Sequence, residues 1–129
     1  MGPPQDGRIV KSHPVANNLR QLRSGDVYAA HTRRRNSYRI GLSVMAMYGA
    51  TMADYGSYPP TPKQIETLCA VAALCVVKYG LVVDEHVRTH YEWAVADGYY
   101  PNRWNFMREG STLRGKVKWY AQRWQQIES

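Results

Sequence analysis

Residues 87–94 read Val87-Arg88-Thr89-His90-Tyr91-Glu92-Trp93-Ala94, and two polar and aromatic groups follow them, Asp97-Gly98-Tyr99 and Arg103-Trp104-Asn105-Phe106. A histidine stands directly after a short run that contains two β-branched residues, and an acid stands two positions later. Histidine and carboxylate side chains are common metal ligands and polar anchors in binding sites. We therefore expect the functional residues of the chain to gather around this segment.

The length and composition predict one globular domain that spans residues 1–129, with residues 1–6 disordered. The chain has 129 residues, of which 44% are hydrophobic and 21% charged. No stretch is long and apolar enough for a membrane span, and the N-terminus has no apolar run of the signal-peptide kind. We expect a cytoplasmic protein without a membrane partner, in which Cys69 and Cys75 are reduced core residues of one helix.

A net charge of +7, from 17 Lys and Arg against 10 Asp and Glu, favours anionic partners. Nucleic acid, an acidic protein and the anionic bacterial wall all meet this requirement. The charge alone does not choose between them.

The hydrophobic pattern predicts an α+β fold, a small mixed β-sheet covered by one long helix and a C-terminal amphipathic helix. Alternating apolar residues predict strands at residues 8–11, 27–31 and 38–48, and further extended pieces at 81–83 and 87–89. Thr61-Pro62-Lys63-Gln64 is a typical helix start, and Gly80 is the expected stop. We expect Ser111 to cap the last helix, whose apolar stripe comprises Leu113, Val117, Tyr120, Trp124 and Ile127.

Several segments resemble the zinc-dependent N-acetylmuramoyl-L-alanine amidases, the family that includes phage lysozyme-type amidases and peptidoglycan recognition proteins. The similar segments are Asp6-Gly7-Arg8-Ile9-Val10, Ala30-His31-Thr32 with Asn36 and Ile40-Gly41-Leu42-Ser43, Thr61-Pro62-Lys63-Gln64-Ile65, and Thr89-His90-Tyr91-Glu92-Trp93-Ala94 with Asp97-Gly98-Tyr99 and Arg103-Trp104. The last of these resembles the form seen in phage and prophage cell-wall hydrolases. The fold that the resemblance implies is a reduced form of the amidase sheet.

The resemblance implies a zinc ion held by two histidines and a third ligand, whose bound water attacks the amide between muramic acid and L-alanine. His90 matches the second histidine ligand. The expected groove residues are His31, Thr32, Asn36 and Glu92. Glu92 and Asp97 are also interpreted as a turn cap and a salt-bridge partner.

Two departures from the family pattern predict a degenerate metal site. The family's first histidine ligand and its Tyr or Glu lie on strands before the Asp-Gly hairpin, where this sequence begins. At the third-ligand position Asn105 replaces an aspartate, and an amide brings no charge to offset the cation. His86 and His90 would be about 13 Å apart on the predicted extended chain, too far to share one ion. We expect no cofactor, or zinc if the chain is an active amidase.

Three functions follow from these observations. The first is a phage or prophage-derived protein of this family that has lost zinc hydrolysis and binds a partner, for example a host defence protein that it inhibits. The second is an active peptidoglycan amidase that lyses the cell wall. The third is a nucleic-acid-binding protein that uses Arg33, Arg34, Arg35 and Arg39, extended by basic residues of the last helix such as Arg114, Lys116, Lys118 and Arg123.

The reduced sheet would also leave an unpaired edge near Arg8–Lys11 or Val27–His31. We expect a second copy of the chain or a partner protein to cover this edge. The partners considered are thus a host or phage protein, a peptidoglycan fragment, nucleic acid and a homodimer mate.

Overall fold

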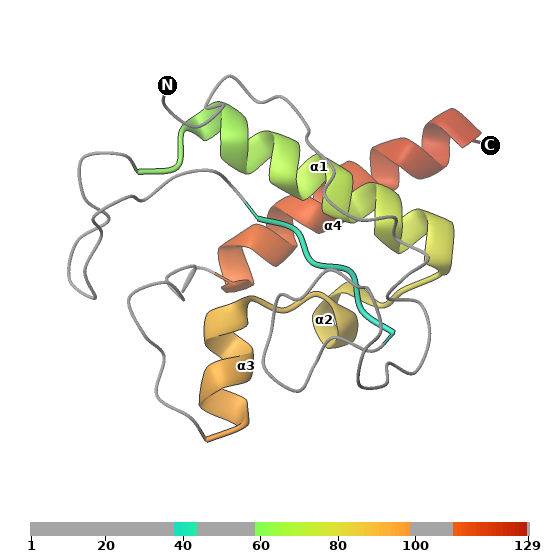
Figure 1. Ribbon diagram of the computed structural model, residues 1–129. Coiled ribbons are helices and arrows are strands. Elements are labelled where there is room, and N and C mark those ends of the chain that lie inside the picture. The colour runs from blue at the N-terminus through green and yellow to red at the C-terminus, as the bar shows by residue number, and fades with distance from the viewer. Residues whose placement is uncertain (1–37, 44–58, 99–109, 129) are drawn as a thin grey trace, which may run out of the picture. The chain divides into compact units, whose positions relative to one another are not determined.

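The computed structural model describes residues 38–43, 59–98 and 110–128, and four helices lie within these ranges (Figure 1). They are α1 (Pro62–Tyr79), α2 (Val83–His86), α3 (His90–Ala96) and α4 (Gly110–Glu128). All four helices belong to one of two compact units of the chain, and residues 38–43 belong to the other. The prediction that residues 1–129 form a single domain stays a prediction.

Helix α1 begins and ends where the sequence predicts. The N–H of Gln64 donates to Thr61 Oγ1 at 3.1 Å, and the N–H of Thr61 donates to Gln64 Oε1 at 3.0 Å, which completes the capping box. Pro62 occupies the first turn, where its missing N–H costs nothing. Gly80 closes the helix in the left-handed conformation, with φ 63°, and its N–H donates to Val76 O.

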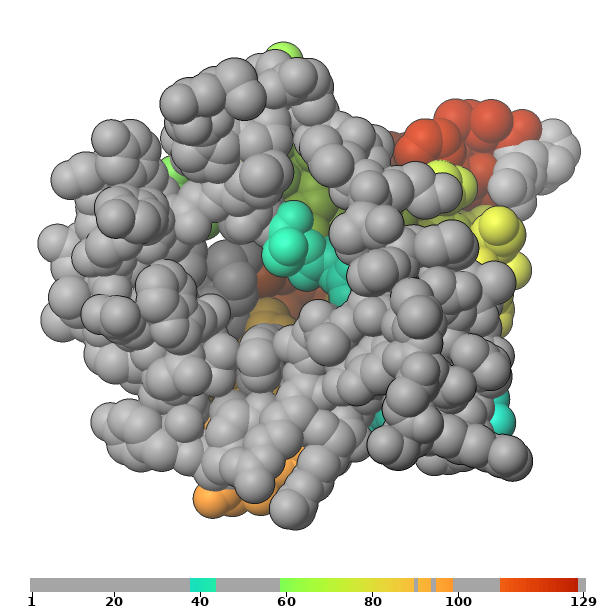
Figure 2. Space-filling view, viewed as in Figure 1, coloured from blue at the N-terminus to red at the C-terminus, as the bar shows by residue number. Residues whose placement is uncertain are grey.

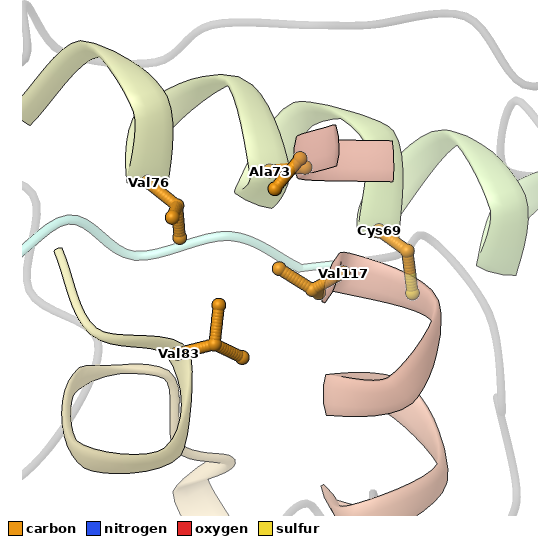
Figure 3. Close-up of a cluster of buried hydrophobic side chains, with 6 residues drawn as sticks. Cys69, Ala73, Val76, Val83 and Val117 are labelled. Atoms are coloured by element: carbon orange, nitrogen blue, oxygen red, sulfur yellow. The ribbon is translucent and has the colours of Figure 1, made fainter. Parts of the chain in front are cut away.

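The core lies between α1, α4 and α2, as Figure 3 shows. Helix α1 contributes Cys69, Ala73 and Val76, which recur at helical spacing on one face. Val117 of α4 and Val83 of α2 point toward these side chains (Figure 3). Cys69 is 1% exposed and Val117 2% exposed, so the α1–α4 contact is the tightest part of the described core.

Polar contacts fix α4 along α1. The indole Nε1 of Trp124 donates to Ala70 O at 3.0 Å, and the hydroxyl of Tyr120 donates to Glu66 Oε1 at 3.1 Å. Lys116 pairs with the same Glu66 carboxylate at 2.8 Å. These contacts give the polar groups at the border of the core hydrogen-bonding partners within the protein.

The C-terminal helix is confirmed, with two corrections. It begins at Gly110, so Ser111 lies inside the first turn and is not its cap. Of the predicted apolar stripe, Leu113, Val117, Tyr120 and Trp124 are in or against the core. Ile127 is 73% exposed, because the C-terminal end of α4 lies at the surface (Figure 2).

The predicted β-sheet is wrong for the part of the chain that the structure describes, which contains helices and no strand. Tyr38 opens the most strand-like run, yet it has φ 57°, a left-handed conformation that turns the chain out of an extended path. Residues 39–43 have no regular structure, and Leu42 is 42% exposed, unlike a residue of a central strand. Alternation defines two faces, but a strand also needs a neighbour that pairs its backbone groups.

The other predicted strands are tested only in part. Residues 8–11, 27–31 and 44–48 lie outside the described residues. The extended piece at 81–83 is corrected at Val83, which begins α2, whereas residues 87–89 are outside any helix, as predicted. The predicted sheet edge, near Arg8–Lys11 or Val27–His31, lies outside the described residues, so the homodimer stays a prediction.

None of the helices in the described ranges combines the length and the apolar character that a membrane span needs.

Candidate functional site

The candidate site centres on the first turn of α3, which begins at His90. Thr89 caps the helix: its Oγ1 accepts the N–H of Glu92 at 3.1 Å, and its own N–H donates to Glu92 Oε1 at 2.9 Å. The N–H of Trp93 donates to the Thr89 carbonyl at 3.1 Å. The backbone on both sides of His90 is therefore fixed by a reciprocal capping box.

Arg114 of α4 extends this capping box to a second helix. Its Nη1 donates to Glu92 Oε1 at 2.7 Å and to the carbonyl of Val87 at 3.2 Å. The side chains of Arg114 and Glu92 are only 13% and 23% exposed. Arg88 approaches the other carboxylate oxygen, Oε2, more loosely at 3.7 Å. One carboxylate thus joins α3, the residues before it and α4.

The ionised form of Glu92 is the stable one. Burial works against ionisation, but the hydrogen bonds from Arg114 and from the Thr89 N–H outweigh it and hold the pKa of Glu92 below its ordinary value. The same contact with Glu92 raises the pKa of Arg114. Glu92 acts here as a cap and an ion-pair partner, which is the structural interpretation that the sequence offered for it.

Gly110 makes room for this carboxylate. A side-chain carbon at Gly110 would overlap the Glu92 carboxylate, and Gly110 is itself buried. The carboxylate therefore lies against the N-terminal end of α4, where N–H groups without an intrahelical acceptor and the helix dipole favour a negative charge. Glycine at position 110 therefore leaves the space that the charged Glu92 carboxylate occupies.

His86 and His90 do not form the helical i, i+4 pair that could grip one ion. His86 is the last residue of α2, and His90 is the first residue of α3. The Nδ1 of His86 already accepts the N–H of Val82 at 2.8 Å. In the described ranges no three His, Cys, Asp or Glu side chains lie together as a metal site would require. Whether the chain binds the zinc that the family resemblance implies stays a prediction.

The remaining predicted site residues are tested little or not at all. Arg39 is half-buried in the segment 39–43. The predicted groove, basic-loop and third-ligand residues lie outside the described residues: His31, Thr32, Asn36, Arg33, Arg34, Arg35 and Asn105. That these residues gather around His90 and Glu92 is still a prediction.

The basic residues of α4 that could extend a nucleic-acid surface have partners within the chain. Lys116 pairs with Glu66 and Lys118 with Asp84, both at 2.8 Å, while Arg114 pairs with Glu92. The guanidinium of Arg123 stacks 3.2 Å from the centre of the Trp119 ring. Whether these residues take part in binding nucleic acid stays a prediction.

Sequence reasoning missed the bridging role of Arg114. The capping box could have been found from the spacing Thr89-x-x-Glu92, a recognised helix-start signature. No local signal could have found Arg114, because it lies 22 residues from Glu92 in the chain.

Comparison with known proteins supports the resemblance. A model of the protein family described as N-acetylmuramoyl-L-alanine amidase matches residues 4–103, which include α1, α2 and α3 but not α4. Searches of curated proteins and of solved structures gave no match. Because the family match covers most of the sequence, the chain belongs to the N-acetylmuramoyl-L-alanine amidase family.

Proposed function

We propose that this protein is a binding member of the amidase family, which holds a partner at the segment around His90 and does not hydrolyse it through zinc. The observation that carries the proposal is the state of Glu92. This acid, two residues from the family histidine, is ionised and held by Thr89 and Arg114. In this state Glu92 has no proton to donate, and its lowered pKa and its hydrogen bonds to Thr89 and Arg114 make it a weak base.

Asn105 supports the same proposal from the sequence. It occupies the position that the resemblance assigns to the third zinc ligand, and its amide carries no charge. The ligand class that family membership favours is a peptidoglycan fragment. A protein of a bacterial host, inhibited by a phage-encoded member of the family, is the other partner that we propose.

Amidase activity is the second candidate function, and the family match itself favours it. In that case the bond broken would be the amide between muramic acid and L-alanine, and zinc would supply a Lewis acid and an activated water. His90 would be one ligand. No three His, Cys, Asp or Glu side chains of the described residues lie together as a metal site would require.

One set of measurements separates the two candidates. Calorimetry of the metal-free protein with zinc, with His90→Ala as the control, tests for the metal site. Calorimetry with a muramoyl-tetrapeptide fragment, followed by chromatography of the products, tests for binding and cleavage. We expect binding of the fragment, no release of the peptide and no zinc binding that depends on His90.

Two results would contradict the proposal in different ways. Release of the peptide together with one-to-one zinc binding that His90→Ala abolishes would establish an active amidase. Failure to bind the fragment would exclude the peptidoglycan ligand. Capture of a host protein at two salt concentrations would then test the protein partner. Contacts with nucleic acid weaken steeply as salt rises, so capture that persists at the higher salt concentration would favour a protein.

A further inference from the structure

We propose that Arg114 is a positioning residue for the His90 segment, and that α4 holds this segment in the geometry that binding of a ligand requires. The inference rests on the proposed function for the identity of the site, but it concerns a helix that the family match does not include. It assigns to α4 a role in the site in addition to its role in the core.

The contacts of Arg114 lie on both sides of His90. On the N-terminal side its Nη1 donates to the Val87 carbonyl at 3.2 Å, and on the C-terminal side to Glu92 Oε1 at 2.7 Å. Glu92 Oε1 also accepts the N–H of Thr89, the residue directly before His90. A single guanidinium nitrogen therefore contacts Val87 and Glu92 directly, and Glu92 links it to Thr89.

Arg114 is itself held firmly. Val117, one turn further along α4, is 2% exposed within the core. The contacts from Trp124 to Ala70 and from Tyr120 to Glu66 fix the rest of the helix on α1. Because buried packing resists small displacements, a guanidinium that extends from this helix is a fixed reference point for the segment it contacts.

The alternatives to Arg114 are weaker. Arg88 reaches the same carboxylate at 3.7 Å, but it lies in the segment that has to be positioned. Lys118 also joins α4 to another element, through Asp84 of α2 at 2.8 Å, but those side chains are 51% and 66% exposed. An exposed pair of this kind contributes little to stability. Lys118 is thus a matched control: the same helix, the same kind of contact, but no link to Glu92.

The test uses the full chain without any ligand. In the ¹⁵N- and ¹³C-labelled protein, the imidazole signals of His90 are assigned by their loss in His90→Gln, and amide exchange is followed at Thr89 and Glu92. Arg114→Met keeps an aliphatic stem but removes the donors, and Lys118→Met is its control. We expect Arg114→Met to move the His90 imidazole signals and to accelerate exchange at Thr89 and Glu92 by about tenfold, while Lys118→Met changes exchange there by less than about twofold.

A purely structural role predicts a different outcome, because Arg114→Met would then lower the stability without a change at His90. Arg114→Lys retains the charge and should restore part of the His90 signal positions. Unchanged His90 signals and unchanged exchange in Arg114→Met would overturn the proposal. If Arg114→Met fails to fold, Arg114→Lys and Glu92→Gln replace it, and unchanged His90 signals in both would overturn the proposal equally.

Binding of the muramoyl-tetrapeptide separates this inference from the proposed function. We expect Arg114→Met to weaken that binding by about tenfold and Lys118→Met to leave it unchanged. If the wild type does not bind the fragment, the proposed peptidoglycan ligand fails, whereas the positioning role is still decided by the ligand-free measurements. If the wild type binds and Arg114→Met binds equally well, the positioning role fails while the proposed function stands.

Discussion

Glu92 Oε1 and Arg114 Nη1 lie 2.7 Å apart and join residues that are 22 positions apart in the chain. The contact connects α3, which lies inside the family match, with α4, which lies outside it. Glu92 caps its own helix with the same oxygen, so the local helix start and the tertiary contact depend on one carboxylate. Such shared groups make the contributions of neighbouring residues non-additive.

A double-mutant cycle should measure this dependence. Each of Glu92→Gln and Arg114→Met leaves a partly buried group without its charged partner, so we expect each to lower the free energy of unfolding by about 1–3 kcal/mol. The double variant should lose less than the sum, by about 1–2 kcal/mol, because the shared contact is removed once. Urea denaturation of the four proteins gives these values. Strict additivity would mean that the two side chains do not interact in solution.

The stability of the protein should fall in acid partly through Glu92. Its pKa in the folded protein is lowered, so its contribution is complete above the unfolded value of about 4.3 and is lost as the pH falls through the folded pKa. The difference in unfolding free energy between wild type and Glu92→Gln should be constant above about pH 5 and shrink below about pH 4. Glu66 and Asp84, whose pKa values are also lowered, affect both proteins and cancel. A difference that grew toward low pH would contradict this account.

Gly110→Ala should destabilise the protein although alanine favours helices. The new methyl group would overlap the Glu92 carboxylate, which must then leave Arg114 or the Thr89 N–H. We expect a net loss of about 1–2 kcal/mol in the free energy of unfolding, because a lost charged hydrogen bond outweighs the gain of about 0.5–1 kcal/mol in helix propensity. Gly115→Ala is the matched control, since nothing surrounds a side-chain carbon at that position of the same helix, and it should be neutral or stabilising.

The sequence predicted the elements whose signals are local. Thr61, Pro62 and Gly80 determine the ends of α1 through backbone hydrogen bonds within one turn, and each is visible as a residue type at a fixed offset. The apolar spacing of α4 similarly placed Val117 in the core. Membership of the amidase family also followed from short motifs in a fixed order, and the family match confirms it.

The sequence failed where the outcome depends on distant partners. The run that begins at Tyr38 alternates like a strand, but alternation contains no information about a pairing partner, and Tyr38 adopts a left-handed conformation. Val83 belongs to a run of aliphatic residues with high strand propensity, yet it begins α2 because packing against α1 and α4 buries it there. The bridge from Glu92 to Arg114 likewise required the packing of α4.

The two cysteines should react at very different rates in the folded protein. Burial, aided by the charge of Glu66, raises the pKa of Cys69 to about 11, so only about one thiol in a thousand is ionised at pH 8. Burial also raises the pKa of Cys75, but that thiol is only half-buried. We expect iodoacetamide to label Cys75 at least about tenfold faster than Cys69, measured by mass spectrometry on Cys75→Ser and Cys69→Ser. In urea, where the protein is unfolded, the two rates should become similar. Equal rates in the folded protein would contradict the buried position of Cys69.

Val117→Ala should be the most damaging small truncation in α4. Val117 is 2% exposed and faces Cys69 and Ala73 across the α1–α4 contact. Removing two methyl groups at about 0.8 kcal/mol each, together with the cavity left behind, should lower the free energy of unfolding by about 2 kcal/mol. Ile127→Ala removes more apolar surface from the same helix, but Ile127 is 73% exposed and its loss should cost less than about 0.5 kcal/mol. Urea denaturation of both variants decides the matter. If Ile127→Ala were the more destabilising variant, the end of α4 would be covered in solution and the core would extend beyond the residues described. If Val117→Ala is the more destabilising, as expected, the core lies at the crossing of α1 and α4.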